Sequence, residues 1–90
     1  MQAENKKKRE AILKSVGTTI KALRLKTGKS ISLISNELNV SKSIWSDTEL
    51  GKSDLQLTTF WRISEALNIE PEELLAIIHQ NIEEEIKFIE

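Results

Sequence analysis

The sequence predicts an all-α domain of five helices, and three observations support this prediction. Apolar residues recur at every third or fourth position over most of the chain, which is the spacing of one helical face. Serine, asparagine, glycine and proline stand between the periodic stretches, where they begin or end helices. A chain of 90 residues, 39% of them hydrophobic, has enough apolar side chains for one small core.

Residues 31–50 predict two short helices joined by a tight turn. Ser30 and Ser41 are good N-cap residues, and each stands directly before a helical pattern. Asn39 readily adopts the left-handed conformation of a sharp helix exit, and small Ser35 stands where the two helices cross closely. The side chains that we expect to face a shared core are Ile34, Leu38, Val40, Trp45 and Thr48. This arrangement is a helix-turn-helix, whose second helix is the part offered to the DNA major groove.

The order of these residues, continued by Glu49, Gly51 and Lys52, resembles the helix-turn-helix domain of the Cro/phage-repressor family of transcriptional regulators, often called XRE-like. The resemblance covers about Val16 to Leu75. It implies a lambda-repressor-like fold of five helices. It also implies a sequence-specific DNA-binding regulator, for example a repressor, that acts as a homodimer.

The resemblance further implies which residues contact DNA. Lys42 and Ser43, at the start of a recognition helix over residues 41–49, would lie at base edges, and Lys52 would bind a phosphate. The full set of implied DNA contacts is Ser30, Ser41, Lys42, Ser43, Ile44, Asp47 and Lys52.

Departures from the family pattern favour a second interpretation. Ile31 replaces the polar residue that contacts a phosphate in most relatives, and Leu33 and Ile44 are apolar at positions that are usually exposed. Asp47 places an acid at a groove-facing position, where it repels phosphates unless it accepts a hydrogen bond from cytosine N4. The alternative is a protein-binding module on the same fold, antitoxin-like or a regulatory adaptor, with weak or lost DNA binding.

The first helix is predicted over residues 9–26, and residues 1–8 are expected to be frayed. Its apolar stripe consists of Ile12, Val16, Ile20, Leu23 and Thr27. The resemblance implies that Arg24 forms a structural ion pair with Glu49 at the end of the second motif helix, and that small Gly17 permits close packing of the first helix.

Two further helices follow the motif. The stripe of the fourth helix is Leu57, Phe60, Ile63 and Leu67, and Trp61 falls outside it on the surface. Pro71 begins a fifth helix, after which neither proline nor glycine interrupts the chain. The apolar spacing therefore predicts an extended C-terminal helix, either one long helix or two helices with a bend near Asn81. The apolar residues near the C-terminus have no place in a core that the first four helices fill, so we expect a two-fold dimer interface there. The predicted interface residues are Trp61, Ile78, Ile82, Ile86 and Ile89.

The net charge of −1 conceals an asymmetry along the chain. Residues 1–29 contain nine lysines and arginines and two glutamates, whereas residues 70–90 contain one lysine and seven glutamates. The run Lys6–Arg9 either adds phosphate contacts or forms a soluble helical turn. The predicted parts of the chain are residues 1–14, a basic N-terminal arm or helix extension, residues 15–75, the helix-turn-helix DNA-binding domain, and residues 76–90, a C-terminal helical extension for dimerisation.

Several functional classes have no support in the sequence. Without cysteine there are no disulfides or thiolate metal sites, and no phosphate-binding loop or nucleophile motif indicates an enzyme. His79, a single imidazole, is expected at the surface and not in a metal site. No cofactor and no membrane contact are predicted, and the expected location is the cytoplasm. The expected partners are double-stranded DNA, a second copy of the chain and, in the alternative interpretation, another protein.

Overall fold

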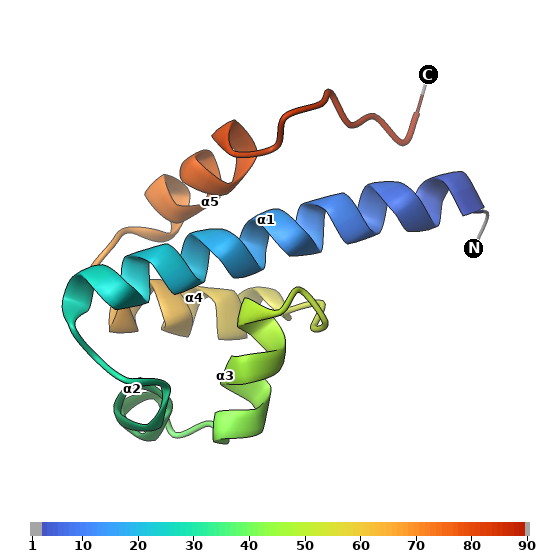
Figure 1. Cartoon of the computed structure of the whole chain (residues 1–90). Coiled ribbons are helices and arrows are strands. Elements are labelled where there is room, and N and C mark those ends of the chain that lie inside the picture. Colours follow the sequence, from blue (N-terminus) through green and yellow to red (C-terminus); the bar gives the residue numbers. More distant parts are fainter. Residues whose placement is uncertain (1–2, 90) are drawn as a thin grey trace.

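The computed structural model describes residues 3–89 and contains five helices and no strand in that range. The helices are α1 (Ala3–Thr27), α2 (Ile31–Leu38), α3 (Lys42–Glu49), α4 (Leu57–Ala66) and α5 (Pro71–Gln80). α1 spans the length of the molecule, with α5 on one side and α2, α3 and α4 on the other (Figure 1). The prediction of an all-α fold with five helices is confirmed.

Two serines begin α2 and α3, as predicted. The Ser30 hydroxyl accepts a hydrogen bond from the Leu33 backbone N–H at 3.1 Å, and the Ser41 hydroxyl accepts one from the Ile44 N–H at 3.1 Å. Each bond satisfies one N–H group that the first helical turn leaves without an acceptor. Between the helices, Asn39 has a φ of 59°, the left-handed conformation that ends α2.

The core lies where the first four helices meet. Its central members are Ile20, Ile34, Leu38, Trp45, Ile63 and Leu67. Ile34 is 0% exposed and Trp45 is 1% exposed, so the inward faces of α2 and α3 are those that the sequence predicted. Ser35 is also buried, and α2 packs against α3.

The buried face of α1 is wider than its predicted stripe. Leu13, Ser15 and Thr19 are buried, although the helical spacing did not assign them to the core. The reason is that α1 is covered from two sides, by α3 and by α5. Ser15 Oγ donates a hydrogen bond to the carbonyl oxygen of Ile78 at 2.8 Å, which fastens the end of α5 to α1.

The prediction for α4 is partly wrong. The apolar stripe predicts a buried Leu57, but this side chain is 70% exposed because α4 begins at this residue, at the edge of the core. Ile63 and Leu67 are buried as predicted. Trp61 is 53% exposed, which agrees with its position outside the stripe.

α1 begins earlier than predicted. Residues 3–8 are helical, although the sequence predicts a frayed segment over residues 1–8; residues 1 and 2 lie outside the described residues. The segment contains neither proline nor glycine, and Glu4 lies in the first turn, where the helix dipole favours an acid. From residue 3 onward, the basic N-terminal segment is therefore a helix extension.

The C-terminal helix is shorter than predicted. α5 ends at Gln80, and residues 82–89 are not helical although their isoleucines continue the helical spacing. The three glutamates at 83–85 oppose a longer helix, since the helix dipole disfavours acids near a C-terminal end. In addition, Asn81 Nδ2 donates a hydrogen bond to Thr19 Oγ1 at 3.0 Å, which holds the chain against α1 where the helix stops. The prediction of an extended C-terminal helix is wrong.

The position of Ile78 corrects the predicted dimer interface. Its side chain is 2% exposed, because the face of α5 that carries Leu74 and Ile78 packs inside the chain. Ile82 and Ile86 are half-buried in a tail that runs beside α1 (Figure 1), and Ile89 is 88% exposed. Ile78 therefore has no surface to offer to a second copy.

Candidate nucleic-acid interface

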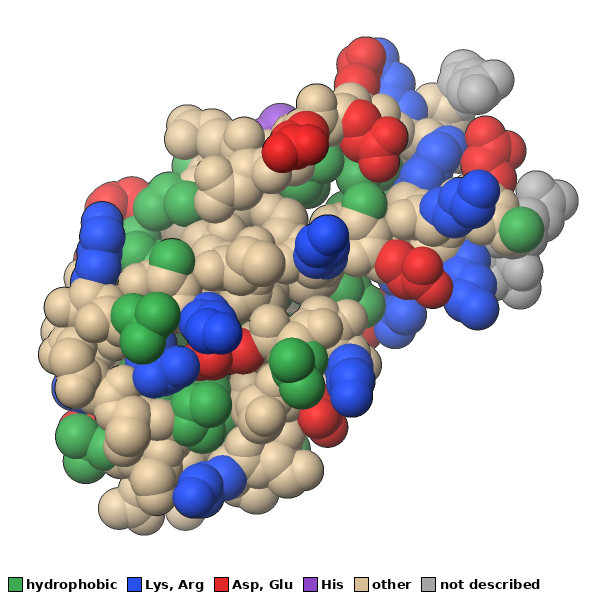
Figure 2. All heavy atoms as spheres, in the orientation of Figure 1, with side chains coloured by type: hydrophobic (Ala, Val, Ile, Leu, Met, Phe, Trp, Pro, Cys, Tyr) green, Lys and Arg blue, Asp and Glu red, His purple; other side chains and the backbone are tan. Residues whose placement is uncertain are grey.

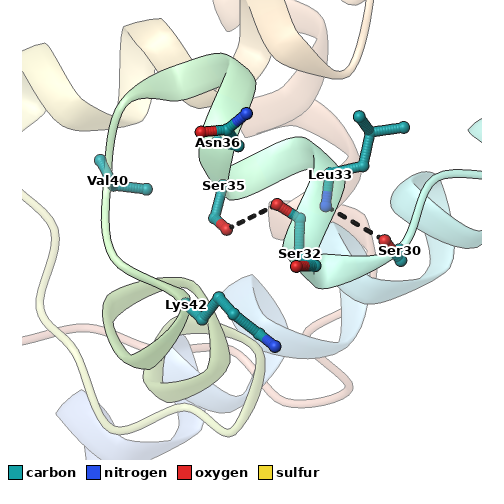
Figure 3. Close-up of a pocket in the computed structure, with 7 residues that line it drawn as sticks. All are labelled: Ser30, Ser32, Leu33, Ser35, Asn36, Val40 and Lys42. Atoms are coloured by element: carbon teal, nitrogen blue, oxygen red, sulfur yellow. Dashed lines mark hydrogen bonds between the residues drawn. The ribbon is translucent and has the colours of Figure 1, made fainter.

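A hollow on the surface separates the start of α2 from the start of α3. It is lined by Ser30, Ser32, Leu33, Ser35, Asn36, Val40 and Lys42 (Figure 3). The Lys42 side chain extends from the first turn of α3 along the edge of this hollow, on the side where α2 begins (Figure 3). The hollow is therefore lined mainly by polar side chains, with one cation at its rim.

The first turns of α2 and α3 have the electrostatics of an anion-binding surface. Neither turn contains an acidic residue, and each leaves backbone N–H groups without an acceptor inside the helix. These groups give each helix start a partial positive charge. Lys42 adds a full charge and forms no ion pair with any residue in the range 3–89. The exposed start of α3 therefore suits an anionic group such as a phosphate.

The opposite end of α3 is fixed by a buried polar cluster around Glu49. Arg24 Nε donates to Glu49 Oε2 at 2.5 Å, and Arg24 Nη2 donates to Glu49 Oε1 at 3.1 Å. The side chains of this pair are 9% and 5% exposed, so the structure contains the ion pair that the family resemblance implies. The hydrogen bond to Glu49 raises the pKa of the Arg24 guanidinium, although burial acts in the opposite direction.

Trp45 is a third member of this cluster, although its helical spacing predicted only a place in the core. Its indole Nε1 donates to Glu49 Oε2 at 2.6 Å, while the ring itself is buried. The signal was present in the sequence, because a donor and an acceptor four residues apart lie on one side of a helix. Glu49 therefore has donors from α1 and from its own helix.

Gly17 brings α1 into direct contact with the end of α3. A Cβ atom at this position would lie 2.4 Å from the Glu49 carbonyl oxygen and 2.7 Å from the Thr48 carbonyl oxygen. Both distances are shorter than real Cβ contacts, so only glycine fits at this spacing of the two helices. The expectation that a small residue permits close packing here is confirmed.

A comparison with known families agrees with this geometry. A family model described as a helix-turn-helix matches residues 20–74, which is more than half of the chain and includes α2, α3 and their turn. The chain belongs to the Cro/phage-repressor helix-turn-helix family. Members of this family are DNA-binding regulators and are typically not enzymes. No protein in a search of curated sequences matches the chain.

The loop that follows α3 presents another exposed cation, Lys52. The Lys52 N–H donates to the Asp47 carbonyl oxygen at 2.8 Å, and Gly51 has a φ of +75°, which turns the chain at the helix exit. A Cβ at Gly51 would lie 3.2 Å from the Leu13 carbonyl oxygen, so the loop packs against α1. Lys52 is exposed and forms no ion pair within residues 3–89.

The residues that were predicted to contact DNA fall into two groups on the domain. Those at the starts of α2 and α3 are all exposed: Ser30, Ser41, Lys42, Ser43 and Ile44. Of these, Ser30, Lys42 and Ser43 line one shallow hollow. Asp47 and Lys52 stand near the other end of α3, where Asp47 is half-buried and has no ion-pair partner among the described residues. The structure therefore brings the first group together and leaves Lys52 apart from it.

Basic side chains are widely distributed over one face of the domain. Figure 2 shows lysine and arginine side chains along α1 and around α2 and α3. No helix among residues 3–89 has the length and apolar character needed to cross a membrane. The same residues contain no group of His, Cys, Asp or Glu side chains that could hold a metal ion, and His79 is exposed.

Proposed function

We propose that this protein is a sequence-specific transcriptional regulator that binds double-stranded DNA with α3 in the major groove. The contrast between the two ends of α3 supports this most strongly. One end is fixed by Glu49 and by the close contact at Gly17. The other end exposes Lys42 and Ser43, with no acidic residue in the first turn. A helix that is fixed at one end and exposes a cation and a hydroxyl group at the other is suited to reading base edges.

Each residue that was predicted to contact DNA has a proposed role in this complex. Lys42 and Ser43 lie at the start of α3 and read base edges, because N-terminal residues of the second motif helix reach the bases. Ile44 contacts a thymine methyl group, and Asp47 accepts a hydrogen bond from cytosine N4. The residues that bind phosphates are Ser30, Ser41 and Lys52.

Two lysine substitutions test these roles against each other. Lys42→Ala should weaken binding mainly at one base pair, by about 1–3 kcal/mol, and relax the preference there. Lys52→Ala should weaken binding to all sequences alike and reduce the slope of log affinity against log salt by about one. Affinities are measured on a site selected from a genomic library, on its single-base variants and at several salt concentrations. Uniform weakening by both substitutions would contradict the assignment of Lys42 to a base.

The basic start of α1 supplies further phosphate contacts in this proposal. Arg9 Nε lies 3.4 Å from Asp54 Oδ2, which joins the start of α1 to the loop that carries Lys52. With a helical rise of 1.5 Å per residue, Lys6 is only about 5 Å along the helix axis from Arg9. The basic start of α1 thus lies next to the loop in which Lys52 is proposed to bind a phosphate.

We further propose that the regulator is a homodimeric repressor on a two-fold related operator. A single short helix reads few base pairs, and pairing two copies raises specificity. Trp61 and Leu57 support an interface on α4, because they are four residues apart on one side of the helix and are 53% and 70% exposed. An indole at the centre of an interface commonly contributes much of its binding energy.

Sedimentation of two variants tests this interface. Trp61→Gln should give monomers that bind the operator weakly, whereas Ile89→Gln, which alters an exposed apolar residue of the tail, should leave the dimer intact. Dimers of Trp61→Gln together with monomers of Ile89→Gln would place the interface in the tail and contradict the proposal.

A second candidate function is supported by one observation. Leu33 and Ile44 are 47% and 48% exposed near the starts of α2 and α3, where an apolar surface suits contact with a protein. Salt dependence separates the two functions. Binding through several phosphates weakens steeply as salt is added, whereas binding through an apolar protein interface changes little.

A further inference from the structure

We propose that residues 82–89, called the tail below, are an autoinhibitory segment. In the free protein the tail occupies the basic start of α1, and DNA phosphates displace it. The tail and the first half of α1 project together from the body of the domain (Figure 1). The inference rests on the proposed DNA-binding function, and it adds a competitor for DNA that belongs to the same chain.

Lys8 is the side chain of α1 that the tail engages directly. Its Nζ donates a hydrogen bond to the carbonyl oxygen of Lys87 and lies 5.8 Å from the centroid of the Phe88 ring. An ammonium group within about 6 Å of an aromatic ring centroid is attracted by the ring face. Lys8 is half-buried, whereas its neighbour Lys7 is exposed. The tail thus uses one cation that a phosphate would otherwise bind.

The tail is acidic where the adjacent helix is basic. Glu83 and Glu84 line one hollow together with Lys14 of α1. The only ion pair of the tail within residues 3–89 joins Lys87 Nζ to Glu85 Oε1 at 3.1 Å, and both partners belong to the tail. The glutamates therefore form no ion pairs with α1, and they make the electrostatic potential at its surface more negative. Such a field opposes the approach of phosphates to this surface.

Few bonds hold the tail, so DNA can displace it without unfolding the helices. The Ile82 N–H donates a hydrogen bond to the His79 carbonyl oxygen at 3.2 Å. Beyond Ile82, residues 83–89 form one hydrogen bond with the remaining described chain, and its donor is Lys8. Phe88 is 51% exposed. Segments with few buried contacts and few backbone hydrogen bonds open at a low free energy.

The test neutralises the tail in the full-length chain. The variant is Glu83→Gln/Glu84→Gln/Glu85→Gln, and the matched control, Glu70→Gln/Glu72→Gln/Glu73→Gln, changes the net charge equally at the start of α5. Affinity is measured on a 30-base-pair duplex of arbitrary sequence at increasing salt. For three charges about 10 Å from the phosphates, the tail variant should bind about threefold to tenfold more tightly at low salt. This gain should shrink as salt rises, and the control should change by less than about twofold.

A second comparison tests the role of Lys8 itself. With the native tail, Lys8→Gln should weaken binding less than Lys7→Gln, because the tail already engages Lys8. When Phe88→Ala is also introduced, which removes the aromatic ring that lies beside Lys8, the difference between the two substitutions should shrink.

Each other outcome overturns the inference in a different way. An equal gain in the tail variant and the control would mean that only the net charge matters. Weaker binding by the tail variant would mean that the tail assists DNA binding. If the unmodified protein and both triple variants all failed to bind any duplex, the proposed function itself would be wrong.

Discussion

Replacing Gly17 by alanine sets two effects of opposite sign against each other. In the interior of a helix, glycine to alanine ordinarily stabilises by about 0.5–1 kcal/mol, because alanine loses less backbone freedom on folding. At this position, however, the new Cβ would lie 2.4 Å from the Glu49 carbonyl oxygen and 2.7 Å from the Thr48 carbonyl oxygen. Both are backbone atoms of α3, so no side-chain rotation can relieve the contact.

The steric effect should outweigh the gain in helix propensity. To lengthen the shortest contact to 3.0 Å, α1 and α3 must separate by about 0.6 Å. That separation would also strain the hydrogen bonds between Arg24 and Glu49, which join the same two helices. Overpacking in a close-packed core typically costs about 1–3 kcal/mol. After the propensity gain is subtracted, Gly17→Ala should lower the free energy of unfolding by about 1 kcal/mol from the middle of both ranges, and by about 2.5 kcal/mol at most.

Urea unfolding measures this loss as a lower midpoint with an unchanged slope. Because the displaced element is α3, affinity for the preferred DNA site should fall as well, while affinity for arbitrary DNA should change little. Ala22→Gly on the exposed side of α1 is the matched control, since it loses helix propensity alone. If Gly17→Ala is more stable than the unmodified protein, the close contact with α3 does not explain the glycine.

Two further substitutions test the two ends of α3. Arg24→Met should lower the free energy of unfolding, measured in urea, by about 3 kcal/mol. This is the low end for breaking a buried ion pair, because Glu49 keeps the indole donor of Trp45. Adding Glu49→Gln should recover part of the loss, and no recovery would mean that the unpaired carboxylate does not cause it. Ser41→Ala should cost about 1 kcal/mol, which is about 4–8 °C in thermal unfolding of a domain this small, since the cap is lost. Ser43→Ala, which removes no cap, should leave the unfolding temperature nearly unchanged, and an equal loss there would argue against capping.

The helix-turn-helix could be predicted from the sequence because its determinants are local. A serine that caps a helix needs only the N–H groups of the next three residues, and Asn39 needs only its own tolerance of a positive φ. The ion pair between Arg24 and Glu49 is different, because its members are far apart in sequence. Only the family resemblance pointed to it.

The C-terminal end of the chain was predicted poorly because distant contacts decide it. The spacing of isoleucines after Pro71 predicts helix to the end of the chain, either unbroken or with a bend near Asn81. The bond from Asn81 to Thr19 instead joins residues 62 positions apart and fastens the chain where α5 ends. Periodicity likewise omits Ser15, which is polar and yet buried because α5 covers that side of α1. Helical spacing describes one buried face, whereas α1 has neighbours on two.

Glu49 connects the stability of the fold with the position of α3. Its carboxylate accepts hydrogen bonds from Arg24 and from Trp45, and Arg24 Nη1 also donates to the Lys29 carbonyl oxygen at 2.9 Å, just before α2. Charge-assisted hydrogen bonds are directional, so this cluster resists rotation of α3 about its own axis, which apolar packing alone would restrain less. A rotation would swing Lys42 out of register with the base edges that it is proposed to read. The residues that define the angle of α3 therefore lie in the protein interior, about two helical turns from the proposed base contacts.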